Sequence, residues 1–224
     1  MVISYTNEKG SRPKPASTGD FSWIMCDPAP MRDGATRVFD RASIRCEGTK
    51  RCFGFETEMR PNFVQFLFCG IRAELEGERC KRSPALVKQH FEDQPAFEAL
   101  GRFIVFRGWD QLEPSDTPET VVFFAPPDVL SGLFTLAYSD KDQPDGAITP
   151  FGSGCASIVC HPYQELQLER PRAVLGMFDV SARPCVALGI LSFAVPWPKS
   201  AGVVSDVDER FLITRSWHRM GTRL

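Results

Sequence analysis

Two short runs of apolar residues constrain the fold more than any other feature of this sequence. RFIVF at 102–106 and TVVFFA at 120–125 are rich in β-branched and aromatic residues, and turn-forming residues bound both. Runs of this length and composition are typical of strands that are buried on both faces. Two later runs, AVLGMF at 173–178 and ILSFAV at 190–195, have the same character. The sequence therefore predicts a central sheet.

Segments with helical spacing of apolar residues lie around these predicted strands. They are 61–75, 83–92 with Ser83 as its N-cap, a helix from Pro127 through Leu136, and a last helix that begins at Asp206 and carries Trp217. Strands alternate with helices from residue 102 onward, which favours a sheet covered by helices over a sandwich or a bundle. We predict an α+β (mixed α/β) fold with a central sheet of about four to six strands.

Composition indicates an ordinary globular protein. The 224 residues include 43 % hydrophobic and 24 % charged residues, and the formal net charge is −2. This charge gives no general attraction to nucleic acid or anionic lipid, so we expect neither partner. We find no signal peptide and no apolar run of membrane-spanning length, so we expect a cytoplasmic protein. Residues 1–20 are predicted to form a mobile or loosely packed arm, and residues 21–224 a single globular domain.

One stretch, PFGSGCASIVCHP at 150–162, concentrates chemically usable groups. A glycine-rich turn that opens a helix presents backbone N–H groups and the positive end of the helix dipole. Gly152, Ser153 and Gly154 are therefore candidates for binding a phosphate, a carboxylate or an anionic cofactor. The alternative is an ordinary flexible turn, because the stretch lacks both the dinucleotide fingerprint and the lysine of a phosphate-binding loop.

The same turn makes Cys155 a candidate thiolate nucleophile or redox centre, and His161 is the best candidate acid or base beside it. We expect the helix to break near His161, because Pro162 follows it. Cys155 and Cys160 are five residues apart, so they do not chelate one ion by themselves. A metal or iron–sulfur site would need ligands from separate segments, such as Cys46 or Cys52 with Cys155. The alternative is that most of the eight cysteines are buried as small apolar residues.

FDVSARP at 178–184 follows a predicted strand, where ligand crevices form in open sheets. Ser181 and Arg183 are candidate contacts for the same anion, although Arg183 can equally hold Asp179. We expect a capping or surface role for His90, and we expect Trp197 to close the core.

Several of these segments resemble a known family of bacterial and archaeal proteins, the uncharacterised ArCR family, a domain of unknown function. The segments are RCEGTKRCFGF, MRPNFVQFLFCGI, LEGERCKRSPALV, VVFFAPPDVLSGL, TPFGSGCASI, PRAVLGMFDVSARP and ILSFAVPWP. The resemblance covers roughly residues 44–218, and residues 1–43 look less like the family. It implies a compact domain with Cys46 and Cys155 in recognisable motifs, and it implies no particular reaction.

Four hypotheses follow. The leading one is a small-ligand or cofactor-binding protein that holds an anionic group of unknown identity at 152–154 and Arg183. The others are a thiol-dependent or redox enzyme that uses Cys155, a metal or iron–sulfur protein, and a structural protein that acts through self-association as a homo-oligomer.

Overall fold

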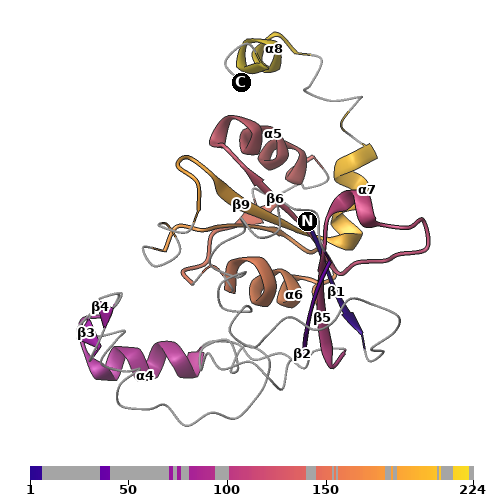
Figure 1. Cartoon of the computed structure of the whole chain (residues 1–224). Helices are drawn as coiled ribbons and strands as arrows, with labels where there is room; N and C mark the ends of the chain where they lie inside the picture. The colour runs from indigo at the N-terminus through magenta and orange to yellow at the C-terminus, as the bar shows by residue number, and fades with distance from the viewer. Residues whose placement is uncertain are drawn as a thin grey trace.

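A computed structural model describes residues 1–6, 36–40, 71–72, 75–76, 81–93, 101–139, 145–152, 154, 156–179, 183, 186–205, 207 and 214–221. Within these residues the fold is α+β, as predicted, and helices pack on a central mixed sheet (Figure 1).

The central sheet has seven strands in the order β2-β5-β1-β6-β9-β8-β7, somewhat more than the four to six predicted. The strands are β1 (Val2–Thr6), β2 (Arg37–Asp40), β5 (Phe103–Arg107), β6 (Thr120–Ala125), β7 (Ala147–Ile148), β8 (Ala173–Gly176) and β9 (Leu191–Pro196). Neighbouring strands are antiparallel, except that β7 and β8 are parallel. A separate two-stranded sheet pairs β3 (Ile71–Arg72) with β4 (Leu75–Glu76).

Strands β5, β6, β8 and β9 form where the sequence predicts buried apolar runs. Ile104, Val105 and Phe106 of β5 are fully buried, as are Phe193 and Ala194 of β9. Such strands lie between two apolar layers, so their side chains are apolar on both faces. The predicted strand at 173–178 ends earlier, at Gly176.

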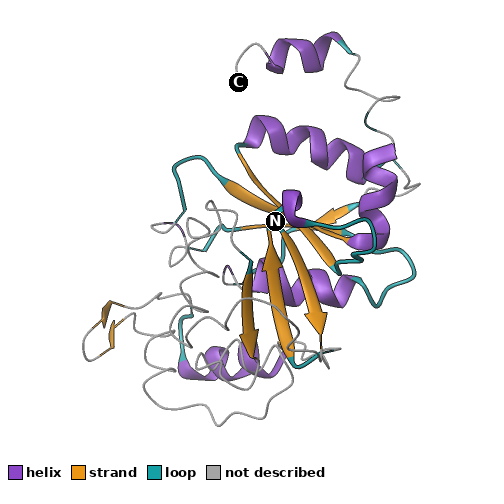
Figure 2. Cartoon of the chain, turned by 45° about the vertical axis from the view of Figure 1, so that its right-hand side comes forward, coloured by secondary structure: helices purple, strands orange, loops and turns teal. Residues whose placement is uncertain are grey.

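Helices cover both faces of the sheet (Figures 1 and 2). On one face α5 (Pro127–Ala137) packs on β9, beside α7 (Trp197–Ser205). A π-helical turn, η4 (Ala156–Cys160), and α6 (His161–Glu165) pack on β8 and β9. Ile158, Val159 and Tyr163 from this segment join one core cluster, whereas Leu130 and Ala137 of α5 belong to another. The alternation of side chains along each strand supplies both clusters.

Other elements lie at the ends of the sheet or beyond it. They are α4 (Pro84–Asp93), the 3-10 turn η3 (Trp109–Gln111) and α8 (Arg215–Gly221). Ser83 caps α4 as predicted, because its Oγ accepts a hydrogen bond from the Leu86 N–H at 3.3 Å.

Two predictions of local structure need correction, and one helix was not predicted. Val2–Thr6 is not part of a loose arm, because β1 pairs with β5 and with β6 inside the sheet; residues 7–20 lie outside the described residues. The predicted helix 61–75 is wrong at 71–72, which form β3, and residues 61–70 lie outside the described residues. Helix α7 was not predicted. Trp217 lies in α8 as expected for a last helix, but the predicted start at Asp206 falls outside the described residues.

Candidate functional site

The glycine turn lies at the carboxyl end of β7, directly before the helical segment that crosses over to β8. Gly152 is half-buried and Gly154 is buried at the start of that segment. Because β7 and β8 are parallel, the residues that follow β8 leave the sheet at the same edge. The structure thus brings the turn and residues 177–179 to one end of the sheet, where ligand crevices form in open sheets.

The backbone at that edge has an unusual conformation. Met177, the residue after β8, is buried and has a φ of 67°, which is uncommon for a residue other than glycine. Strained backbone of this kind is concentrated at functional sites, and so are π-helical turns such as η4.

The helical segment does not break at His161, which corrects the sequence-based prediction. The chain passes from the π-helical turn directly into α6, with Pro162 in the first turn of α6. Proline is tolerated there because its missing N–H and fixed φ suit the first turn of a helix.

Gly176 allows this segment to approach the sheet closely. A Cβ at Gly176 would lie 2.2 Å from the Ser157 Cβ and 3.1 Å from the Ser192 Oγ. The Ser157 Oγ donates to the Gly154 carbonyl at 2.9 Å. Ser192 is fully buried, and its Oγ has no hydrogen-bond partner among the residues that the structure describes. Polar groups are therefore buried directly beneath the glycine turn.

His161 lies against the turn. A Cβ at Gly152 would be 3.3 Å from the His161 Nε2, and the Nδ1 lies 3.1 Å from the Gln164 Oε1. Burial lowers the pKa of His161, whereas the hydrogen bond to Gln164 and the charge of Glu165 act in the opposite direction. The neutral form of the His161 ring is thus favoured. Its Nδ1 lies against the side-chain amide of Gln164 and not against a nucleophile.

Arg183 lies between β8 and β9 in the chain and forms hydrogen bonds to residues on both sides of it. Its Nη1 donates to the Ile190 carbonyl at 2.5 Å, and its backbone N–H donates to the Asp179 carbonyl at 3.2 Å. This arginine therefore has a structural partner, and its remaining N–H groups are the ones left for an anion.

Four of the predicted site residues, Cys46, Ser153, Cys155 and Ser181, lie outside the described residues. Their roles stay predictions, and so do the thiol and metal hypotheses. The described cysteine in this stretch, Cys160, is buried in the core.

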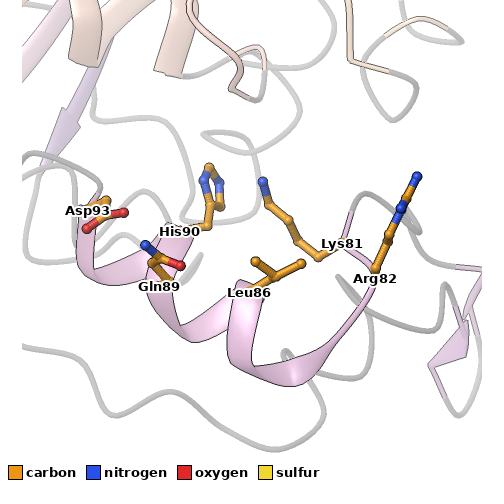
Figure 3. Close-up of a pocket in the computed structure, with 6 residues that line it drawn as sticks. All are labelled: Lys81, Arg82, Leu86, Gln89, His90 and Asp93. Carbon is orange, nitrogen blue, oxygen red and sulfur yellow. The ribbon is translucent and has the colours of Figure 1, made fainter.

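A pocket of about 420 Å³ lies along one face of α4. Lys81 and Arg82 precede the helix, and Figure 3 shows them on the same side as the helix residues that complete the pocket. Those residues are Leu86, Gln89, His90 and Asp93. Their spacing of three and four residues places them on one helical face. Among the described lining residues, Lys81 and Arg82 are cations and Asp93 is a carboxylate, so these residues together carry a net charge of +1 when His90 is neutral.

The pocket adjoins the glycine turn through Phe151, the residue before Gly152. The Lys81 Nζ lies 4.7 Å from the centre of the Phe151 ring, and the His90 ring meets that ring edge-on with centroids 5.8 Å apart. Burial and the charge of Lys81 lower the pKa of His90, and Asp93 opposes them. The pocket at α4 and the glycine turn are thus adjacent in the structure, although they are far apart in the sequence.

A sequence model of the family described as uncharacterised ArCR matches residues 5–206. The chain belongs to the uncharacterised ArCR family. The match begins well before residue 44, so the similarity extends further toward the N-terminus than the motifs alone indicated. No curated protein and no solved structure matches the chain.

The basic pocket of this ArCR domain was not predicted from the sequence. Lys81 and Arg82 read as charges before a helix and His90 as part of its solvated face, and nothing local links them to Phe151. The sequence feature that could have indicated this pocket is the pair Lys81-Arg82, which stands directly before a capped helix that carries a histidine.

Two further findings apply only to the described part of the ArCR domain. No three His, Cys, Asp or Glu side chains there are grouped so that they could hold a metal ion. No helix there has the length and apolar character needed to cross a bilayer.

Proposed function

We propose that this ArCR domain binds a small anionic molecule or cofactor between the basic face of α4 and the glycine turn. The observation that carries the proposal is that Lys81 and His90 line a pocket and also contact Phe151 of the turn.

The charges of the pocket favour an anion. Lys81 and Arg82 form no ion pair with the described residues, so their positive charges are available to a ligand. Lysine and arginine are the side chains that bind phosphate and carboxylate most often, arginine with two parallel hydrogen bonds. The volume of about 420 Å³ lies within the range of small-molecule sites.

The position of the turn supports the same function. Gly152 and Gly154 follow the carboxyl end of β7, and a side chain at Gly152 would collide with Ala156 at 2.8 Å. The space of a side chain at Gly152 is thus filled by Ala156, and the support for this function comes from the place of the turn after a strand, where ligand crevices form in open sheets.

Calorimetric titration with inorganic phosphate and pyrophosphate tests the proposal. We expect wild type to bind at least one of them, and we expect Arg82→Ala and Lys81→Ala each to weaken binding about tenfold, as the loss of one charge-assisted hydrogen bond would. Lys88→Ala is the matched control, because Lys88 lies on the same helix and pairs with Glu92 at 3.8 Å.

Equal affinity in wild type and Arg82→Ala, with Lys88→Ala unchanged, would contradict this location of the site. Absence of binding by every anion tested would contradict the proposal as a whole.

A further inference from the structure

Phe151 leaves much of its ring uncovered at the edge of the basic pocket. Its side chain is 60 % exposed, although the rings of most phenylalanines are buried. The Lys81 ammonium lies over the ring, and His90 meets it edge-on. Leu86, which lines the pocket, is 45 % exposed. Exposed apolar side chains therefore lie next to the cations, with Phe151 on the turn and Leu86 on the helix.

The contact between Lys81 and the ring is one that an anion can replace. A charge-assisted hydrogen bond is stronger than an exposed cation–π contact, so a bound anion will draw the ammonium toward itself. The face of Phe151 that Lys81 covers then becomes available to another group. A planar ring gains most from it, because aromatic pairs gain attraction beyond their buried area.

We propose that the pocket takes an anion that carries an aromatic ring, with its acidic group on Lys81 and Arg82 and its ring against Phe151. This inference rests on the proposed function and names the ligand class of the same site. A volume of about 420 Å³ suits a small molecule.

Two phosphate esters that differ only in the ring test this inference. Phenyl phosphate and methyl phosphate are titrated by calorimetry at pH 8, where both are dianions because the second pKa of a phosphate ester is about 6. We expect wild type to bind phenyl phosphate about three- to tenfold more tightly, in line with measured aromatic pairs. In Phe151→Leu we expect this preference to disappear, and we expect methyl phosphate to bind at least as tightly as in wild type, because Lys81 no longer leaves a ring contact to reach the anion.

Phe134→Leu is the matched control, because Phe134 is also exposed but lies on α5, against Tyr138. It should keep the preference for phenyl phosphate. If wild type binds both esters equally, the ring inference is overturned and the anion site stands. If it binds neither, the proposed function is overturned with it. If Phe151→Leu keeps the preference, Phe151 is not the ring's partner.

Discussion

At the scale of single residues, Gly176 determines how closely the helical segment formed by η4 and α6 packs on the sheet. Gly176 ends β8 where the Ser157 side chain packs, and its missing Cβ leaves room for that side chain. Ser157 in turn holds the Gly154 carbonyl. The position of the glycine turn therefore depends on a second glycine in a different strand.

Gly176→Ala is expected to destabilise the protein by about 1–3 kcal/mol, because the new methyl group would overlap the Ser157 side chain and force the helical segment away from the sheet. Urea denaturation measures the loss. Gly202→Ala in α7 is the control, because no atom lies within 4 Å of the added Cβ. It should gain stability, since alanine favours a helix over glycine. Equal effects of the two substitutions would contradict this account.

His90 gives anion binding a pH dependence. Its pKa is lowered below the ordinary value of 6.5, so the ring is neutral at pH 7 and gains a charge only as the pH falls further. Lys81 opposes that charge and Asp93 favours it. A bound anion stabilises the protonated ring and raises its pKa, so binding takes up a proton and strengthens toward low pH.

We therefore expect sulfate, which does not titrate in this range, to bind more tightly at pH 5.5 than at pH 7.5, with a much smaller change in His90→Gln. Calorimetry in two buffers of different ionisation enthalpy measures the proton uptake. An unchanged pH profile in His90→Gln would exclude His90 as the group that titrates.

At the scale of elements, α4 has two faces with different tasks. Val87 is fully buried, whereas Leu86, Gln89 and His90 turn toward the pocket. The helix has ten residues, and isolated helices of that length are marginal in water. Its cap and its buried face must therefore hold the basic residues in position.

Ser83→Ala is expected to destabilise α4 by about 0.5–2 kcal/mol, because the Leu86 N–H loses its partner. Amide hydrogen exchange across residues 84–93 should speed up accordingly, and phosphate binding should weaken with it. Ser83→Asp, which keeps an acceptor at the cap, should retain slow exchange. Unchanged exchange in Ser83→Ala would show that packing alone maintains the helix.

At the scale of the whole molecule, the central sheet joins segments from distant parts of the chain. β1 lies between β5 and β6, so residues 2–6 pair with residues 103–107 and 120–121. The main-chain bonds continue to Met1, whose carbonyl accepts from the Val122 N–H at 2.8 Å. Integrity of the sheet therefore depends on a segment for which the sequence predicted no structure.

Ile3→Ala tests that dependence. Ile3 is 1 % exposed and belongs to the main core cluster, so we expect a loss of about 2–5 kcal/mol, against about 0.5–1.5 for Ile3→Val. Urea denaturation of both variants measures these losses. Val204→Ala, at an exposed position, should change stability by less than about 0.5 kcal/mol. A similarly small effect of Ile3→Ala would contradict the placement of β1.

The elements with strong local signals were predictable. β5, β6, β9, α4 and α5 follow from apolar runs, helical spacing and the Ser83 cap. β1 was missed because its apolar residues are few and its partners lie about a hundred residues away. α7 was missed because Pro198 and Gly202 normally interrupt helices. The glycine turn and α4 were both recognised, but their proximity was not, because the contacts of Phe151 are long-range.

The central place of β1 has a consequence for biosynthesis. Residues 2–6 leave the ribosome well before their partner β5, which follows about a hundred residues later. At typical rates of about 5–20 residues per second, β1 waits roughly 5–20 s before it can pair. During that interval Val2 and Ile3 have no core to enter, and an unpaired strand is a template for association with other chains. The segment that completes the centre of the sheet is thus exposed to aggregation while the rest of the sheet is still being synthesised.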